Sequence, residues 1–476
     1  MLQNPKNILL FYPPGEQFQR GEDRCQSNIK KSTATSMRAC NDLGYMSAVL
    51  KNHNTFIRDY STENASINDF IEDIKNFHPD YLILSTTNAT IFYDLNIVKE
   101  AKKYCNAKVI LKGAIFYDAP EELLSLLELK DVDILIGSEA EFLLPDIINQ
   151  KELKEIPCIF YKENNKWHKN EFNKWFDNLD DLPFPDRNKM KNELYTRPDI
   201  GEPMATIQTS RGCPSACIYC LSPQISGKKI RYRSPENVMK ELEECYFKYG
   251  IKNFFFKADT FTFNQEWTLK LCKLIKESEL YGNISYTANS RVKPLSQEVL
   301  NAMADTGCFT IAFGFETGNQ ETMKKIKKGV TIEDNRKAVE YAKKAGIPVY
   351  GFYMIGFPWE TKQHIKDTEK LIFELNCDFL EIHMALPYYG SQFYELCKQE
   401  RVLENSSIGT DYFHSSTKGT KYLSNKELLK IRKHIILKYH LRPSYIFKKL
   451  KQSKLNIKIL KNYFKFGIRL ILNLFR

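Results

Sequence analysis

The sequence predicts an α/β protein with two parallel sheets and a helical tail. Short apolar runs alternate with helix-length segments over residues 1–150 and again over residues 201–400, which is the pattern of parallel strands joined by helices. Residues 151–200 interrupt this alternation, and residues 401–476 combine lysines with apolar residues at helical spacing. We therefore expect two α/β domains, a linker between them and a C-terminal helical region.

The first part, residues 1–150, is expected to be a doubly wound parallel sheet. Ligands of such sheets lie beyond the carboxyl ends of the strands, so the loops 13–15, 85–90, 112–116 and 137–139 are the candidate contact points. No Gly-x-Gly-x-x-Gly motif follows the first apolar run, which disfavours a dinucleotide site; a protein-binding or purely structural domain is the alternative. Strands are expected at 6–12, 81–85, 108–111 and 133–136, and helices at 37–52, 95–104, 120–129 and 140–150.

Residues 151–200 are polar and aromatic. Asn164 to Trp167 indicate a hairpin turn, and the segment DNLDDLPFPDRNKM that follows combines prolines with acidic residues. Proline restrains its own backbone and that of the preceding residue, so we expect an ordered, extended linker and place the domain boundary here.

Residues 201–400 are expected to contain six strand-helix units. Six are fewer than the eight of a closed α/β barrel, so a partial (β/α)6 barrel is predicted, with its chemistry at the carboxyl ends of the strands. Strands are expected at 205–209, 253–257, 284–288, 309–313, 348–354 and 379–384, and helices at 235–248, 265–277, 297–305, 332–345, 361–375 and 392–398.

The positive charge is concentrated at the C-terminus. The chain has a net charge of +11, and the segment from Lys421 to Arg476 contains sixteen Lys and Arg but one acid, Glu427. Basic amphipathic helices are expected there. We favour a role in capping the main domain. Binding to an anionic membrane surface is the second interpretation, and binding to nucleic acid is the least favoured.

The expected location is cytoplasmic. The 476 residues include no apolar run long enough to span a bilayer, and the first residues lack the pattern of a signal peptide. The basic tail adds peripheral contact with the inner membrane surface as an alternative.

Three of the twelve cysteines are clustered. Cys213, Cys217 and Cys220 lie in TSRGCPSACIYC, directly after the first strand of the predicted barrel. Cysteine thiolates hold iron–sulfur clusters, and three of them leave one iron of a four-iron cluster free for a small molecule. A zinc site is disfavoured because no second Cys-x-x-Cys pair exists. The other nine are expected to be small buried hydrophobes: Cys25, Cys40, Cys105, Cys158, Cys245, Cys272, Cys308, Cys377 and Cys397.

The spacing Cys213, Cys217, Tyr219, Cys220 resembles the C-x-x-x-C-x-aromatic-C signature of the radical S-adenosylmethionine (radical SAM) superfamily. The resemblance covers residues 178–400. It implies that the three cysteines bind a [4Fe-4S] cluster whose fourth iron chelates SAM. It also implies reductive cleavage of SAM to a 5′-deoxyadenosyl radical, which abstracts hydrogen from the substrate.

The resemblance also assigns SAM contacts at the strand ends. Asp259 would take the SAM amino group, although Ala258 fills the place of a second acid that relatives often carry, and capping of the next helix is the alternative. Asn289 and Arg291 would bind the carboxylate, with a structural ion pair as the alternative for Arg291. The full set of implied cofactor contacts is Tyr219, Asp259, Asn289, Arg291, Gly314 and Glu316.

Glu316 matches the position that receives the ribose hydroxyls, and Gly314 would allow close backbone approach. Gly356 and Pro358 in YMIGFPWET would shape the adenine pocket, or form a plain turn. No catalytic side chain beyond these contacts can be assigned.

A doubly wound, Rossmann-like sheet joined to the barrel by a segment like LDDLPFPDR resembles the cobalamin (B12)-binding subgroup of this superfamily. Members commonly have a Gly-Gly pair and a Gly-Glu-Gly-Glu motif, where this chain has Gly113-Ala114 and the run Gly137-Ser138-Glu139-Ala140-Glu141. Each lost glycine adds a Cβ where backbone would approach the corrin. An Asp-x-His-x-x-Gly motif is also absent. Cobalamin binding therefore stays an expectation, and a cobalamin-free enzyme is the alternative.

The function implied by this resemblance is cobalamin-dependent C-methylation of an unactivated carbon. The substrate is expected to be a small or lipid-like molecule entering between the domains, and the electron donor to be of the flavodoxin or ferredoxin kind. One alternative is a radical SAM enzyme that performs cyclisation, oxidation or rearrangement. An RNA methylthiotransferase is disfavoured because the N-terminal cysteines lack the expected surroundings. A non-catalytic membrane- or nucleic-acid-binding protein on a degenerate barrel is the alternative from another class.

Overall fold

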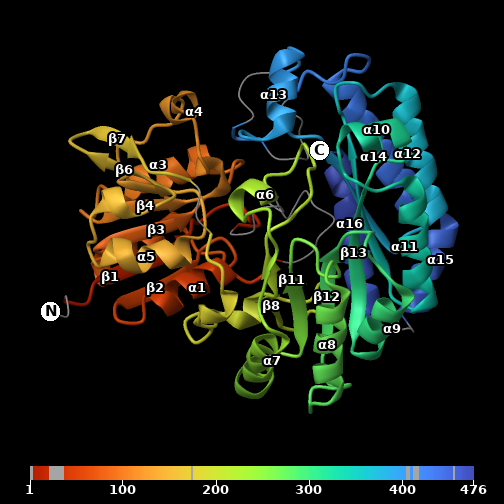
Figure 1. Cartoon of the computed structure of the whole chain (residues 1–476), viewed down its shortest axis with the longest axis horizontal. Coiled ribbons are helices and arrows are strands. Elements are labelled where there is room, and N and C mark those ends of the chain that lie inside the picture. Colours follow the sequence, from red (N-terminus) through yellow and green to blue (C-terminus); the bar gives the residue numbers. More distant parts are fainter. Residues whose placement is uncertain are drawn as a thin grey trace.

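The computed structural model describes residues 4–20, 37–172, 175–403, 408–410, 417–453 and 456–475. This part of the chain forms a seven-stranded sheet, a six-stranded sheet and a two-stranded ribbon. Figure 1 shows the first sheet and its helices (red to yellow) beside the second sheet and its helices (green to cyan), with α6 between them. The predicted α/β fold with parallel sheets is confirmed.

The first sheet is doubly wound, with strand order β2-β1-β3-β4-β5-β6-β7. Alternate side chains of β1 face opposite cores: Ile8 and Leu10 pack with α1 and α5, whereas Leu9 and Phe11 pack with α2 and α3. Both faces are therefore covered, as in parallel sheets generally. The elements are β1 (Asn7–Tyr12), α1 (Asn41–Val49), β2 (Asn54–Asp59), α2 (Ile67–Phe77), β3 (Tyr81–Ser85), α3 (Ile91–Ala101), β4 (Lys108–Lys112), α4 (Glu121–Ser125), β5 (Ile134–Ile136), α5 (Ala140–Ile148), β6 (Ile159–Glu163) and β7 (Lys166–Lys169).

This sheet extends past residue 150. The strands β6 and β7 form the expected hairpin, with Asn164 and Asn165 at positive φ in its turn, but β6 also pairs antiparallel with β5. The placement of the linker at 151–200 is therefore wrong for residues 159–169. Phe160 faces the core of the first sheet, and that packing, which the polar composition of the segment concealed, makes the hairpin the edge of the sheet.

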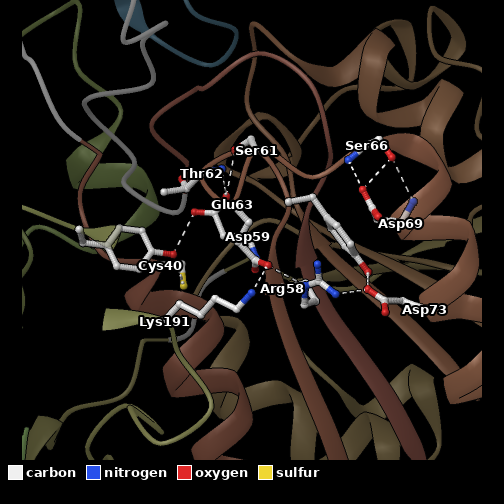
Figure 2. A network of polar contacts seen from close by, with 12 residues as sticks. Cys40, Arg58, Asp59, Ser61, Thr62, Glu63, Ser66, Asp69, Asp73 and Lys191 are labelled. Atoms are coloured by element: carbon white, nitrogen blue, oxygen red, sulfur yellow. Dashed lines mark hydrogen bonds and ion pairs between the residues drawn. The ribbon is translucent and has the colours of Figure 1, made fainter. Parts of the chain in front are cut away.

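Two elements between residues 53 and 80 were missed from the sequence, the edge strand β2 and the helix α2. Alternate residues of β2 are exposed or half-buried, so it lacks the continuous apolar run of the buried strands. A capping box between Ser66 and Asp69 starts α2. Figure 2 shows this cap beside the network at the end of β2, where Ser61 Oγ and Thr62 N donate to Asp59 at 2.9 and 3.0 Å.

The segment before the second sheet is fastened to both sheets. Lys191 Nζ lies 2.7 Å from Glu63 Oε2 (Figure 2), and Tyr195 Oη donates to Asp59 at 3.0 Å. The buried Arg187 donates to Glu241 of α7 at 2.7 Å. These contacts fix the first sheet against the second.

The second sheet has the strand order β15-β14-β13-β12-β11-β8, and all five pairings are parallel. Its spatial order follows the chain order, as in the predicted partial barrel of six strands. The elements are β8 (Met204–Gln208), β9 (Ser210–Arg211), α6 (Ser222–Ile225), β10 (Arg231–Tyr232), α7 (Pro235–Glu243), β11 (Asn253–Lys257), α8 (Gln265–Lys276), β12 (Ser285–Ser290), α9 (Gln297–Asp305), β13 (Cys308–Glu316), α10 (Gln320–Lys325), α11 (Ile332–Lys344), β14 (Val349–Ile355), α12 (Lys362–Leu375), β15 (Phe379–Met384) and α13 (Gln392–Gln399). Short turns of other helix types occur at Ala114–Phe116, Leu153–Glu155, Leu179–Asp181, Asn192–Leu194 and Glu244–Lys248.

The C-terminal helices α14 (Asn425–His440), α15 (Pro443–Gln452) and α16 (Ile457–Phe475) pack on the second sheet. Tyr445 Oη donates to the carbonyl of Asp378, just before β15, at 2.9 Å. Asn462 of α16 donates to the carbonyl of Asp199, before β8, at 2.7 Å. The tail therefore contacts segments that precede both edge strands of the partial barrel, and part of it packs against the main domain. Among the described residues, no helix is both long and apolar enough to cross a membrane.

Candidate active site between the two sheets

The cysteine loop follows β8 through a turn that only glycine fits. Gly212 has φ +97°, and a Cβ there would lie 2.1 Å from the carbonyl oxygen of Lys229. Cys213 is buried, and Cys217 and Cys220 are half-buried. The N–H of Ser222 donates to the Cys220 sulfur at 3.4 Å, at the start of α6.

All three thiols line one cavity of about 230 Å³ between the two sheets. Within the described residues, no three His, Cys, Asp or Glu side chains are already close enough together to hold a metal ion. The loop thus brings the cysteines to one cavity wall without gathering them around a point.

The six implied SAM contacts line the same cavity as the cysteines. They come from the cysteine loop and from the carboxyl ends of β11, β12 and β13, because parallel strands present these ends at one edge. These residues are Tyr219, Asp259, Asn289, Arg291, Gly314 and Glu316. Gly356 and Pro358 are not among the lining residues of this cavity.

Asp259 lines the cavity and does not cap the next helix. Its carboxylate accepts the N–H of Gly212 at 2.9 Å, which ties the end of β11 to the cysteine loop. The N-cap of α8 is instead Asn264, which accepts from Trp267 N at 3.0 Å. The capping alternative for Asp259 is therefore wrong.

Arg291 extends from the end of β12 toward the cysteines. Its Nη1 lies 4.0 Å from the Cys217 sulfur, and its Nη2 donates to the carbonyl of Lys328. A guanidinium at this position places fixed positive charge beside the Cys217 sulfur.

A buried ion pair forms part of the cavity wall. The Nζ of Lys328 contacts Glu316 Oε1, and the two residues are 6% and 7% exposed. Glu316 has φ +61° beside a register shift in β13, so the bulge turns its side chain into the cavity. Burial, with Cys217 and Glu316 nearby, raises the pKa of the Tyr219 phenol well above its ordinary value.

Gly314 makes room for this ion pair. A Cβ at Gly314 would lie 2.4 Å from Glu316 Oε1 and 2.8 Å from Lys328 Nζ. The family resemblance implies that this glycine admits a ligand, but its immediate neighbours are the two charged side chains. Lys328 itself was missed, because it follows α10 in a lysine-rich turn that carries no distinguishing pattern.

Loops of the first sheet complete the cavity, as expected for its carboxyl edge. Asn88 comes from the loop after β3, and Ala114 and Ile115 come from the loop after β4. His383, at the end of β15, is a further lining residue that sequence reasoning missed; its place at the carboxyl end of a predicted strand was the available signal. Tyr388 and Tyr389 also line the cavity.

A charged network connects the first sheet to the cysteine loop. Arg211, two residues before Cys213, contacts Glu139 at 3.2 Å and also Glu141. Arg231 of β10 contacts Glu139 at 2.7 Å. Burial alone would raise the pKa of the Glu141 carboxyl, but the cations of Arg211 and Lys112 outweigh it and lower that pKa. Glu139 and Glu141, which lie where related sequences have a Gly-Glu-Gly-Glu motif, thus contact arginines of the barrel domain.

Seven of the nine scattered cysteines are buried, in agreement with their expected role. These are Cys40, Cys158, Cys245, Cys272, Cys308, Cys377 and Cys397. Cys105 is half-buried, and Cys25 lies outside the described residues.

Residues 207–372 match the model of the radical SAM superfamily. This range contains the cysteine loop and the six implied SAM contacts, and the chain therefore contains a radical SAM domain and is an enzyme of that kind. The domain implies a [4Fe-4S] cluster and SAM as cofactors.

Relatives extend the similarity beyond this domain. The chain is 29% identical, over 93% of its length and 94% of the relative, to an uncharacterized methyltransferase of Pyrococcus horikoshii. It is 31% identical over 38% of its length to the cytidylyl-2-hydroxyethylphosphonate methyltransferase of Streptomyces wedmorensis, of which it covers 35%.

Two solved structures share the two-sheet fold. The radical SAM methyltransferase TsrM from Kitasatospora setae, with cobalamin and [4Fe-4S] cluster bound, aligns with TM-score 0.65 and 14% identity over 85% of this chain and 76% of that one. The cobalamin-dependent radical enzyme OxsB, with aqua-cobalamin and SAM bound, aligns with TM-score 0.63 and 17% identity over 89% of this chain. This chain spans 58% of the OxsB chain.

Proposed function

We propose that this chain is a cobalamin-dependent radical SAM methyltransferase acting on an unactivated carbon of a small or lipid-like molecule. The observation that carries the proposal is one cavity whose walls come from the cysteine loop, from the strand ends of the barrel and from loops of the first sheet. A relative matched over nearly its whole length is named a methyltransferase, and the two-sheet fold is that of solved cobalamin-bound enzymes.

The donor set fits a [4Fe-4S] cluster with one open iron. Cys213, Cys217 and Cys220 supply three thiolates to one cavity, and the loop would draw them together on binding. When bound, the cluster and SAM supply the electron transfer and radical that activate a carbon–hydrogen bond. Asp259 and Asn289 would bind the SAM amino acid portion, and Arg291 would bind its carboxylate and offset the negative charge of the thiolates.

Glu316 would accept hydrogen bonds from the SAM ribose. Lys328 and Tyr219 hold the Glu316 side chain in place, so its carboxylate is oriented before the nucleotide arrives. Such preorganisation lowers the cost of ordering the site on binding. Lys328 is accordingly a positioning residue.

The first sheet supports cobalamin at the same interface. Ala114 lines the larger of the two cavities between the sheets, and Ser138 lines the smaller one. Gly113 and Gly137 serve loop packing instead, since a Cβ on Gly137 would lie 2.6 Å from Phe116 and Tyr117 backbone. When bound, cobalamin supplies a carrier for the methyl group. The cavity of about 230 Å³ is smaller than the roughly 300–1,000 Å³ typical of ligand pockets, so loading of both cofactors requires its surrounding loops to move.

The wall formed by β14, β15 and the following loop suits an amphiphilic substrate. Phe352, Met354 and Leu386 give it an apolar surface, and His383 and Tyr388 add polar atoms. The bound cluster also needs a one-electron reductant, for which flavodoxin or ferredoxin is the proposed class.

The test is anaerobic reconstitution with iron, sulfide and cobalamin, followed by turnover of SAM labelled in its methyl group with a panel of amphiphilic substrates. We expect stoichiometric cobalamin, 5′-deoxyadenosine and a product heavier by one labelled methyl. Cys217→Ala should abolish formation of both products. Cys245→Ala, which changes a buried cysteine outside the cavity, should leave their formation unchanged. Formation of 5′-deoxyadenosine without cobalamin retention or methylated product would instead support a cobalamin-free radical enzyme.

We also propose that the tail docks on an anionic membrane surface. Phe447 of α15 and Ile457 and Phe464 of α16 are 71%, 73% and 69% exposed, and exposed lysines such as Lys461 and Lys465 flank them. Apolar side chains among basic ones complement anionic lipid.

Vesicle flotation tests this surface. We expect binding to anionic but not neutral vesicles, loss of binding at high salt, and weaker binding for Phe447→Ser with Phe464→Ser. Phe247→Ser is the control, because Phe247 is 60% exposed elsewhere. Equal binding of neutral vesicles would contradict this proposal.

A further inference from the structure

A second, smaller cavity lies beside the candidate active site. It has a volume of about 80 Å³ and lies between the carboxyl edges of the two sheets, with Asp259 and Asn289 common to both cavities. Water occupies roughly 30 Å³ per molecule in the liquid, so the smaller cavity accommodates a group of only a few non-hydrogen atoms.

Its charged lining residues balance one another. Four cations, Arg38, Lys112, Arg211 and Lys257, face four anions, Asp42, Glu139, Glu141 and Asp259. Arg211 contacts both glutamates, and Lys112 lies 3.7 Å from Asp42. A charged ligand would gain attraction from one set and repulsion from the other, so this lining does not favour an ion.

The polar groups left without partners are neutral. Within the described residues, both amide atoms of Asn41 and the hydroxyl of Ser210 have no hydrogen-bond partner, although the residues are only 5% and 1% exposed. Both residues line the smaller cavity. Asn41 starts α1, which packs on the first sheet, and Ser210 lies in β9, which follows the first strand of the second sheet. Buried polar atoms without partners are costly, on the order of 1–3 kcal/mol each, so these atoms indicate a missing polar group.

We propose that this cavity binds a primary carboxamide, one of the amide side chains on the rim of the cobalamin corrin. A carboxamide offers two N–H donors and one acceptor oxygen, which complement the acceptor and donor of the Asn41 amide and the hydroxyl of Ser210. The inference rests on the proposed use of cobalamin and deepens it, because it assigns one residue of the N-terminal domain and one of the barrel domain to one corrin substituent. Asn41 and Ser210 would thereby fix the corrin beside Asp259 and the candidate SAM site.

The experiment measures cobalamin affinity by corrin absorbance in anaerobically reconstituted protein, independent of turnover. Asn41→Ala and Ser210→Ala should each raise the Kd about tenfold, the effect of losing hydrogen bonds worth roughly 1.4 kcal/mol. Asn41→Asp, which keeps the size of the side chain but removes its donors, should also weaken binding. Asn283→Ala is the control, because Asn283 is exposed and outside both cavities. Melting temperatures verify that each variant is folded.

A second arm uses cobalamin derivatives in which a single carboxamide is hydrolysed to a carboxylate. One derivative should bind wild type about tenfold more weakly than cobalamin, and Asn41→Ala should lose most of this discrimination. The inference is overturned if wild type binds cobalamin while the Asn41 and Ser210 variants bind it equally well, or if no derivative is disfavoured. Failure of wild type to bind cobalamin would overturn this inference together with the cobalamin part of the proposed function.

Discussion

The ion pair between Glu316 and Lys328 provides a quantitative test of how the candidate nucleotide site is built. Both side chains are more than nine-tenths buried, and removing one partner leaves the other as an uncompensated charge. Such a loss costs about 3–5 kcal/mol in a fully dry interior. Because this pair lines a cavity and not a close-packed core, we expect the lower end, about 3 kcal/mol, for either Glu316→Gln or Lys328→Met.

The double variant separates charge from packing. With neither charge present, only hydrogen bonds and contacts are lost, so the combined change should cost about 1–2 kcal/mol, less than either single change. The assay is urea unfolding of the iron-free protein at pH 7.5, followed by far-UV circular dichroism. Glu321→Gln is the matched control, because Glu321 forms an exposed pair with Lys325 at 2.7 Å, and no measurable change is expected. Two outcomes would contradict this prediction. One is a loss of unfolding free energy in the single variants as small as that of Glu321→Gln. The other is a loss in the double variant equal to the sum of the two single losses.

Three further predictions concern the surroundings of the site. Glu360 is fully buried, and burial raises its pKa from 4.5 to about 7. Between these pH values the folded state binds more protons than the unfolded state, so the free energy of unfolding should fall as pH rises from 4.5 to 7. Glu360→Gln should reduce this pH dependence, measured by urea unfolding at pH 5 and pH 8. An unchanged slope would contradict the assignment. Arg211→Gln leaves Glu139 and Glu141 without one cation, so cluster incorporation measured as iron per protein should fall, whereas the exposed Arg336→Gln should incorporate iron as wild type does. Gly212→Ala forces a Cβ to within 2.1 Å of a backbone carbonyl at positive φ, so it should lower the iron content severalfold, while Gly250→Ala, at positive φ but with open space around it, should leave the iron content unchanged.

The resemblance to the radical SAM superfamily selected the candidate site residues, and their places at strand ends explain why they line one cavity. Asp259, Asn289 and Glu316 are far apart in the sequence, yet each comes at the carboxyl end of a strand whose apolar run was evident. Parallel pairing then places them at one edge. The cysteine spacing predicted the cluster ligands, and the six strand-helix units predicted the partial barrel.

What escaped prediction depends on contacts between distant segments. Lys328 follows a helix in a turn rich in lysine, and only the bulge at Glu316 gives it a partner. The pairing of β6 with β5 and the contacts of Arg211 with Glu139 and Glu141 depend on how elements pack. Neither periodicity nor spacing encodes such juxtapositions.

The central claim is that three cysteines hold a cluster whose open iron binds SAM. Electron paramagnetic resonance of the reduced, anaerobically reconstituted protein, recorded with and without SAM, tests it most directly. We predict a [4Fe-4S]⁺ signal whose g values shift on addition of SAM and which is lost in Cys213→Ala. A protein that assembles no cluster, or a cluster signal that SAM leaves unchanged, would contradict the account.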